Sequence, residues 1–396
     1  MTQTERIVSG PPKPLITLFV ILVGVSLFLN PWNSAMVQGI DTNFVPRYIS
    51  LAIGCPLAAL KLLQQKRVHL YIVFALLFLL WILFRSVDAR IPEEAISASR
   101  YYLIGIVTFG VLTLIPLTES QIYFMIGAQI AGCAIAAQMM LQGGIDLDPG
   151  SKFRLTAGDV NGNYVAYCCV HAASLLALAF QIRREQSRGG ARSLLVMTLC
   201  MTILMVGVVL PLTRGAFIGF AIVLFMVVHG YFKLKARRRV YLGYAIILLC
   251  IVGILAMSPA LLARFSEGSG GDYGSDRLLL WGVAFGLFQG APITGIGTGQ
   301  YASAAFGIPT HNVFLAFLTE QGIIGFMLFM GFLYTIFRRV RSQCEGFGPW
   351  FFFLPWFVIA MTGAWERSYA AYAGFGILVA MGNTLCAKGG KNNANR

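Results

Sequence analysis

Four arginines occupy positions at the edges of long apolar runs, where a cation is unusual. Arg214 stands in T-R-G-A-F with almost no loop around it, and Arg154 opens a polar segment, R-L-T-A-G-D-V-N-G-N. Arg277 precedes a short apolar stretch, and Arg367 follows Glu366 in W-E-R-S. A guanidinium fork matches phosphate oxygens in a bidentate manner and stays charged at any working pH. If two or three of these arginines converge at a membrane surface, they could hold the diphosphate of a polyprenyl lipid.

Each of these arginines also has a simpler explanation. An arginine at the end of a membrane span, such as Arg214, can extend its charged group to the interface at little cost. Arg277 and Arg367 could form local ion pairs with Asp276 and Glu366, which are worth little at a surface. The sequence alone leaves both explanations open.

A histidine and a glutamate form the second group of chemically capable residues. His311 precedes Asn312 in T-H-N-V-F-L, where another apolar run begins, and Glu320 lies two turns into that run. A neutral imidazole can accept a proton from a sugar hydroxyl, and a carboxylate at membrane depth is functional by default. A helix-capping role for His311 and a structural hydrogen bond for Glu320 are the alternatives.

The elements that carry these residues are predicted to be membrane helices. Of the 396 residues, 57% are hydrophobic and 12% are charged, and the mean hydropathy is +0.74. A soluble domain carries about twice that charged fraction, so a soluble enzyme, a secreted disulfide scaffold and a disordered protein are excluded. At roughly 20 residues per span, we predict one all-α integral membrane domain over residues 1–396. Its twelve expected spans are 14–30, 48–63, 69–84, 101–117, 121–141, 164–180, 193–211, 216–232, 240–257, 313–337, 349–365 and 370–387.

The basic residues predict how these spans are oriented. The formal net charge is +14, which resembles a nucleic-acid-binding signature. However, 20 of the 30 Lys and Arg residues fall on alternate connections with only four acids, a balance of +16 on one face and −2 on the other. Such an excess marks the cytoplasmic face. Both termini are therefore expected in the cytoplasm, and no nucleic-acid partner is expected.

One external connection is far longer than the others. It runs over residues 258–312, and its first part, 267–276, is rich in Gly, Ser and Asp. An apolar stretch at 278–288 follows, which is too short to cross a bilayer and is predicted as an interfacial or re-entrant helix. Long loops of this kind commonly build lids or acceptor sites. We therefore expect this loop to lie on the periplasmic face as part of the active site.

The sequence was also searched for disulfide, metal-binding and nucleotide-binding patterns. All eight cysteines lie within expected spans or at their cytoplasmic ends, so no disulfide framework is predicted. The sequence has no Cys/His pair with zinc spacing and no Gly-rich P-loop. Neither a metal nor a nucleotide cofactor is therefore expected.

Taken in order, these motifs resemble the O-antigen ligase and O-antigen polymerase superfamily of integral membrane glycosyltransferases. The resemblance rests on T-R-G-A-F at 213–217, on the stretch from Arg277 through G-I-G-T-G at 295–299, and on H-N-V-F-L-A-F-L-T-E-Q-G-I-I-G at 311–325. The segment at 154–163 is also similar. Motifs cover about residues 150–340, whereas the first 140 residues agree only in being hydrophobic.

The resemblance implies a GT-C-like fold in the bacterial inner membrane with its active site facing the periplasm. It implies transfer of a glycan from undecaprenyl diphosphate to an acceptor hydroxyl, with inversion at the anomeric carbon and without a metal. By the same resemblance, His311 and Arg214 would be catalytic, and Arg214, Arg277 and, less directly, Arg154 would contact the diphosphate. We add four candidate supporting residues, namely Asn312, Glu320, Glu366 and Arg367.

Three functions remain open at this stage. A ligase would use the lipid A–core oligosaccharide as acceptor, and twelve spans with one late, moderate loop favour this branch. A polymerase of O-antigen, capsule or exopolysaccharide would use another lipid-linked repeat with the same donor chemistry. A transporter or flippase for lipid-linked polysaccharide would instead predict a repeated half-structure and charged or broken helices at mid-membrane.

Overall fold

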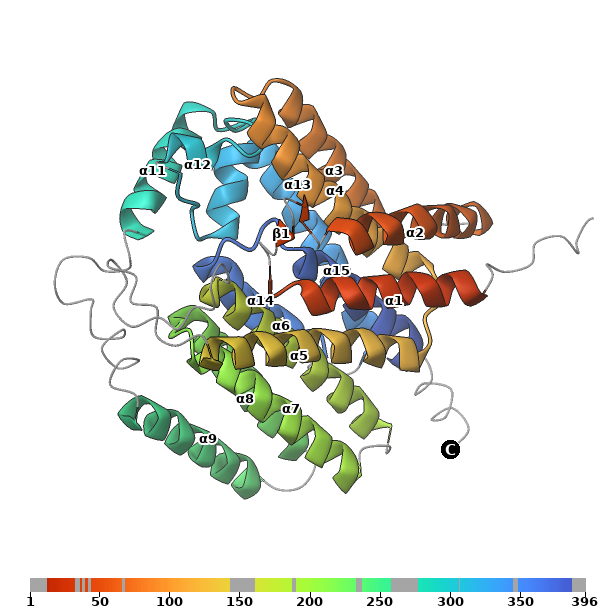
Figure 1. Ribbon diagram of the computed structural model, residues 1–396, viewed down its shortest axis with the longest axis vertical. Helices are drawn as coiled ribbons and strands as arrows, with labels where there is room; N and C mark the ends of the chain where they lie inside the picture. The colour runs from red at the N-terminus through yellow and green to blue at the C-terminus, as the bar shows by residue number, and fades with distance from the viewer. Residues whose placement is uncertain are drawn as a thin grey trace, which may run out of the picture.

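The computed structural model describes most of the chain as a bundle of helices (Figure 1). Arg154 and the part of the long loop before residue 277 lie outside the described residues. The described ranges are 13–32, 36–37, 40–41, 44–65, 68–142, 161–186, 190–232, 237–257, 277–305, 307–344 and 348–386.

The elements follow the chain in a simple order, with one two-residue antiparallel strand pair, β1 and β2, between the first two helices. They are α1 (Lys13–Leu29), β1 (Met36–Val37), β2 (Ile40–Asp41), α2 (Phe44–Gln64), α3 (Leu70–Val87), α4 (Pro92–Leu114), α5 (Glu119–Gln142), α6 (Gly162–Glu185), α7 (Ala191–Val209), α8 (Arg214–Phe232), α9 (Arg237–Met257), α11 (Arg277–Gly290), α12 (Tyr301–Ala304), α13 (Val313–Gln343), α14 (Trp350–Thr362) and α15 (Tyr369–Met381), which a π-helical turn, η3 (Gly382–Cys386), extends.

All twelve predicted apolar runs are helical. Among the described residues, nine helices are long and apolar enough to cross a membrane, and three shorter apolar helices cover 13–29, 240–253 and 350–362. By length and composition, these helices are consistent with a polytopic membrane protein, whereas the count of twelve crossings stays a prediction. The stretch predicted as a short helix at 278–288 is also helical and forms α11, which packs on α13.

Two helices form the centre of the bundle. Helix α6 is buried along most of its length among α5, α7, α8 and α14, and α15 is buried against α4. Both helices are rich in Ala, Gly and other small residues, which let helix backbones approach closely where no water competes. Gly374 of α15 illustrates this approach, because a Cβ there would overlap the ring of His171 in α6. Helix α9 packs mainly on α8 at the margin of Figure 1.

Hydrogen bonds connect the termini of different helices at two opposite ends of the bundle. At the first, the Asn30 end, the Asn30 amide donates to the Tyr164 hydroxyl at the start of α6 (3.1 Å). At the second, the Cys344 end, Arg339 donates to Asn383 beyond α15 (2.9 Å). Each contact joins helix ends that are far apart in the chain, and the alternating order of the crossings stays a prediction. The side of the membrane that each end faces stays a prediction.

One sequence expectation is wrong. Cys344, after α13, and Cys386, at the end of η3, form a disulfide with Cα atoms 5.4 Å apart. The pair is 42 residues apart in the chain and becomes adjacent only because α13 and η3 pack together. Spacing could not reveal it, since each cysteine alone reads as a residue at the end of a span.

Candidate active site

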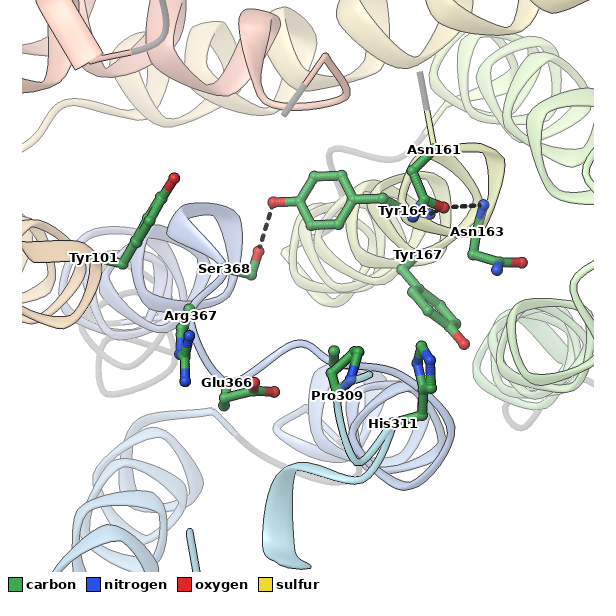
Figure 2. Close-up of a pocket in the computed structure, with 11 residues that line it drawn as sticks. Tyr101, Asn161, Asn163, Tyr164, Tyr167, Pro309, His311, Glu366, Arg367 and Ser368 are labelled. Carbon is green, nitrogen blue, oxygen red and sulfur yellow. Dashed lines mark hydrogen bonds between the residues drawn. The ribbon is translucent and has the colours of Figure 1, made fainter. Parts of the chain in front are cut away.

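A pocket of about 340 Å³ lies at the Asn30 end of the bundle. Figure 2 shows side chains from α4, from the start of α6, from the segment before α13 and from the loop between α14 and α15 around it. Its volume is at the lower end of the roughly 300–1,000 Å³ typical of small-molecule sites. Its lining residues are Tyr101, Asn161, Asn163, Tyr164, Tyr167, Pro309, His311, Ala364, Glu366, Arg367 and Ser368.

The first turn of α6 builds one wall of the pocket. Asn161 caps this helix, because its side-chain oxygen accepts hydrogen bonds from the backbone N–H groups of Asn163 (3.0 Å) and Tyr164 (3.4 Å). Asn163 in turn accepts a hydrogen bond from the Thr213 hydroxyl (2.7 Å), which ties α6 to the residue before α8. The Tyr164 hydroxyl contacts Ser368 across the pocket wall (3.2 Å). The wall is therefore fixed by a cap and by two contacts between distant segments.

The segment before α13 places His311 in the pocket. His311 is half-buried and has φ 51°, in the left-handed region that a non-glycine residue seldom adopts. The cap of α13 is the next residue, Asn312, whose side chain accepts from the N–H groups of Phe314 (3.0 Å) and Leu315 (3.2 Å). The capping role that the sequence offered to His311 thus belongs to Asn312. Trp281 of α11 donates to the Thr310 carbonyl (3.0 Å) and fixes this segment from outside.

Glu366 is the carboxylate of the pocket. Its residue is 9% exposed, and its Oε2 atom has no hydrogen-bond partner among the described residues. Its backbone carbonyl accepts a hydrogen bond from the Tyr372 hydroxyl (3.0 Å). Burial raises the pKa of Glu366, and the neighbouring Arg367 guanidinium opposes that rise. The pocket therefore holds a buried carboxyl group with unused hydrogen-bonding capacity.

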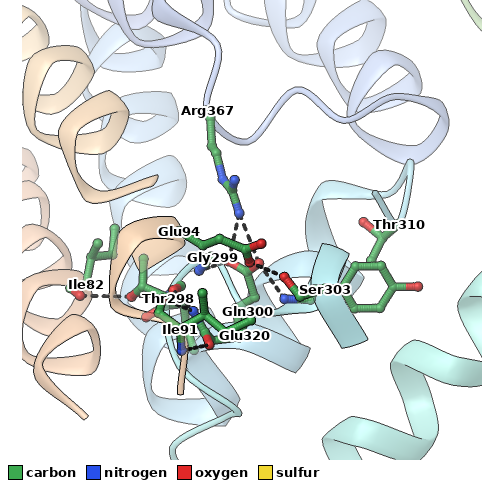
Figure 3. Close-up of polar contacts among 12 residues, drawn as sticks. Ile82, Ile91, Glu94, Thr298, Gly299, Gln300, Ser303, Thr310, Glu320 and Arg367 are labelled. Carbon is green, nitrogen blue, oxygen red and sulfur yellow. Dashed lines mark hydrogen bonds and ion pairs between the residues drawn. The ribbon is translucent and has the colours of Figure 1, made fainter. Parts of the chain in front are cut away.

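Arg367 reaches the pocket from an ion pair with Glu320. The pair is 3.0 Å long, and the side chain of Glu320 is 3% exposed whereas that of Arg367 is 32% exposed. Glu320 also accepts hydrogen bonds from the backbone N–H groups of Gly299 (3.0 Å) and Tyr301 (3.2 Å), as Figure 3 shows. The local pair of Arg367 with Glu366, considered from the sequence, is thus replaced by a pair with Glu320. Glu320 joins the G-I-G-T-G loop to the α14–α15 loop.

A break in α13 makes this junction feasible. Gly322 has φ 64° and ψ −170° inside the helix, and a Cβ there would overlap the carbonyl of Ile293. The opened backbone pairs with the loop, since Ile296 donates to the Thr319 carbonyl (2.9 Å) and Gly297 donates to the Glu320 carbonyl (3.0 Å). Irregular backbone at such a depth is tolerated where protein covers it. The G-I-G-T-G loop at 295–299 and the E-Q-G-I-I-G stretch at 320–325 therefore pack together as one junction.

The structure groups some of the predicted site residues and leaves others apart. His311, Glu366 and Arg367 line one pocket, and Asn312 and Glu320 support its walls. Arg214 and Arg277 are the first residues of α8 and α11 and do not line the pocket. Leu212, two residues before Arg214, has φ 54°. Within the described ranges, it and His311 are the two non-glycine residues with positive φ, and each lies two residues before the first residue of a helix.

Sequence reasoning missed several pocket residues. The tyrosines at 101, 164 and 167 lie within apolar runs, where an aromatic residue is usually part of the core. Asn161 carried a usable signal, because an Asn before an apolar run indicates a helix cap. Arg47 was also missed. It is 1% exposed behind the Tyr164 wall, where it contacts Asn30 (3.4 Å) and lies over the Tyr369 ring (4.6 Å).

Comparison with known proteins adds an independent finding. Curated proteins yield no match to the chain. The family model described as O-antigen ligase matches residues 199–330, a range that contains Arg214, Arg277, His311 and Glu320 and lies inside the region of predicted resemblance. The matched region covers about a third of the chain and supports its similarity to the O-antigen ligase and polymerase superfamily.

Proposed function

We propose that the protein is an O-antigen ligase-type glycosyltransferase of the bacterial inner membrane. It transfers a glycan from undecaprenyl diphosphate to a hydroxyl of the lipid A–core oligosaccharide on the periplasmic face. The observation that carries this proposal is the pocket lined by His311, Glu366 and Arg367. Thr213, the residue before Arg214, bonds to Asn163 of the pocket wall, and Trp281, one turn after Arg277, bonds to Thr310 beside His311. No metal or other cofactor takes part in the proposed reaction.

The positions of Arg214 and Arg277 suit a diphosphate. Each is the first residue of a helix, and the first turn of a helix carries unpaired N–H groups and a partial positive charge that favour anions. An arginine at such a position adds a bidentate fork to the same charge. Undecaprenyl diphosphate is a good leaving group, so stabilising its developing charge is the larger catalytic contribution. Arg154 is proposed as a third, weaker contact.

His311 is proposed to contact the acceptor hydroxyl. Its left-handed backbone conformation costs about 1–2 kcal/mol, and such strain concentrates at functional sites. Since Asn312 serves as the helix cap, capping does not account for His311. The imidazole either accepts the hydroxyl proton or orients the hydroxyl toward the anomeric carbon.

A reconstitution assay tests the function directly. Purified protein in detergent is mixed with lipid-linked glycan and lipid A–core, without a membrane gradient. Wild type is expected to form the covalent product, whereas Arg214→Ala should lower the rate by about 100- to 1,000-fold and His311→Ala by about 100-fold or more. Absence of product with wild type would contradict the transferase, and a transporter would give that result.

The same assay separates a ligase from a polymerase. Supplying only lipid-linked repeat units should give no longer chains if the acceptor is the lipid A–core. Chain growth from repeats alone would show that the protein is a polymerase of the same superfamily and not a ligase. Unchanged rates in both variants would refute the assigned residues without refuting the reaction.

Cysteine labelling tests the orientation. In a protein lacking the exposed Cys55 and Cys250, Glu93→Cys probes the start of α4 at the pocket end, and Ser342→Cys probes the end of α13. Both residues are exposed. An impermeant thiol reagent added to the periplasm should label position 93 and spare position 342. The reverse pattern would place the pocket in the cytoplasm and contradict the proposal.

A further inference from the structure

Glu366 is the pocket residue whose chemistry the proposed function has not used. Its side chain lines the same pocket as His311 but comes from a different segment, the loop between α14 and α15. Figure 2 shows both residues at the pocket on the side opposite Tyr164. The two groups can therefore approach one bound sugar from separate directions.

The hydrogen-bonding state of Glu366 points to a missing donor. An ionised carboxylate is a pure acceptor with sites for several hydrogen bonds. The Oε2 atom of Glu366 is buried and has no donor among the described residues. Leaving a buried acceptor unsatisfied is unfavourable, so each such atom in a folded protein calls for an explanation. A hydroxyl group of a ligand in the pocket would supply the missing donor.

The surroundings of Glu366 hold it in place. The preceding residue, Trp365, is 1% exposed, and the Tyr372 hydroxyl binds the Glu366 carbonyl (3.0 Å). The following residue, Arg367, is anchored to Glu320 by the ion pair described above. A catalytic group needs such a supported geometry. Glu366 thus has a fixed backbone, lines the pocket, and has a buried carboxylate oxygen without a donor among the described residues.

We propose that Glu366 is the catalytic base that removes the proton of the acceptor hydroxyl. This inference rests on the proposed function and assigns the proton transfer within it, leaving His311 to orient the acceptor. As the acceptor oxygen forms its bond to the anomeric carbon, its O–H bond breaks and the proton moves to Glu366 Oε2. The bond from the anomeric carbon to the diphosphate oxygen breaks at the same time, and its electron pair leaves with undecaprenyl diphosphate.

The charges around Glu366 are compatible with this role. Burial raises the pKa of its carboxyl group, the Arg367 guanidinium lowers it, and the Glu320 carboxylate raises it further. Tyr102, Tyr372 and His311 are further titratable residues near the carboxyl group. A base is most effective when its pKa lies near the operating pH. The direction of the shift therefore brings this carboxylate closer to the useful range.

Two variants and a matched control test the assignment. Glu366→Gln keeps the size of the side chain but cannot take the proton, and Glu366→Ala leaves space for a small carboxylate such as formate. Glu93→Gln is the control, since Glu93 is an exposed carboxylate in the first turn of α4 that does not line the pocket. Thermal unfolding of each variant in detergent shows whether it has folded.

The expected results separate a base from a structural residue. Glu366→Gln should lower kcat by about 100-fold or more with little change in donor KM, and Glu93→Gln should match wild type. The rise of rate with pH that reports ionisation of Glu366 should be absent in Glu366→Gln. Formate should partly restore the activity of Glu366→Ala, which loss of a merely structural contact would not allow.

Other outcomes overturn the inference. If wild type transfers glycan and Glu366→Gln is equally active, Glu366 is not the base, and the proposed function stands. If Glu366→Gln is slow but keeps the wild-type pH profile and formate gives no rescue in Glu366→Ala, the residue acts structurally and the inference fails. If wild type gives no product, the proposed function itself fails.

Discussion

Two buried carboxylates lie on either side of Arg367, and their environments differ. Glu320, in α13, accepts hydrogen bonds from the backbone of Gly299 and Tyr301 and pairs with Arg367 at 3.0 Å. Glu366, the residue before Arg367, lines the pocket and has one oxygen without a partner among the described residues. Both are buried glutamates, 3% and 9% exposed, so residue type and burial do not explain the difference.

The difference indicates that the two carboxylates have different roles. A buried carboxylate that is fully hydrogen-bonded stabilises the segments it joins. A buried carboxylate with an unused acceptor lowers stability, and such groups persist at functional sites. Glu320 is therefore interpreted as a structural junction that positions Arg367, and Glu366 as a group that meets the substrate. Substitutions at and around the two residues test whether their roles differ in this way.

The largest effect on stability is expected at Glu320. Glu320→Ala removes three acceptor contacts and leaves the Arg367 guanidinium without its ion-pair partner. Removing one partner of a buried pair costs about 3–5 kcal/mol, and the partial exposure of Arg367 favours the lower end of that range. Thermal unfolding in detergent measures the loss. Glu93→Ala is the matched control, and an equally small loss in both variants would contradict the structural role of Glu320.

A smaller loss is expected at Gly322, which disturbs the Glu320 junction without changing its carboxylate. Gly322→Ala places a Cβ at φ 64° against the Ile293 carbonyl. Backbone strain of this kind costs about 1–3 kcal/mol. Gly282→Ala in α11 is the control, because nothing lies near the added Cβ, and it should be neutral or stabilising by about 0.5–1 kcal/mol. Similar unfolding temperatures for the two variants would show that α13 does not need its break.

The same difference in roles is expected between two adjacent residues at the start of α13. Asn312 accepts two backbone hydrogen bonds as the helix cap, whereas His311 lines the pocket with φ 51°. Asn312→Ala should cost about 1 kcal/mol of stability. His311→Gly relieves the left-handed strain, so it should lower stability less than Asn312→Ala, although it should abolish transfer. Unfolding temperature and activity are measured for both variants, and a larger stability loss in His311→Gly than in Asn312→Ala would indicate a structural histidine.

Much of the fold was predictable from sequence, because the signals are local. Each of the twelve predicted apolar runs is helical, and the short helix at 278–288 is present as α11. A bilayer demands long apolar runs with internal hydrogen bonding, so hydropathy alone reports them. The motif around His311 was equally visible, since a polar pair at the start of an apolar run is distinctive within one short segment.

The remaining features depend on contacts between distant segments. Glu320 and Arg367 are 47 residues apart, and only the packing of α13 near the α14–α15 loop pairs them. Gly322 reads as an ordinary glycine of a membrane helix until the G-I-G-T-G loop is seen filling the break. Arg47 and the pocket tyrosines have no local pattern that separates them from core residues. Hydrophobic periodicity carries no information about any of these pairings.

The smallest expected effect is the change in stability with pH that ionisation of Glu366 causes, and its sign distinguishes a functional from a structural carboxylate. Because burial raises the pKa of Glu366 in the folded protein, the carboxyl group binds its proton more tightly in the folded than in the unfolded state. Its contribution to stability is complete at pH values below the unfolded pKa, about 4.3, and is lost as pH rises through the raised folded value. As pH rises from about 4.3, wild type should therefore lose stability relative to Glu366→Gln, which cannot ionise.

At pH 7.5, Glu366→Gln should accordingly be more stable than wild type by about 1 kcal/mol, while its transfer activity is much lower. A gain in stability that accompanies a loss of activity is typical of residues retained for function. Unfolding temperatures of both proteins across this pH range give the sign. A Gln variant that is less stable than wild type at every pH would mean that the Glu366 carboxylate has a structural partner, as Glu320 does. The contrast between the two carboxylates would then be lost.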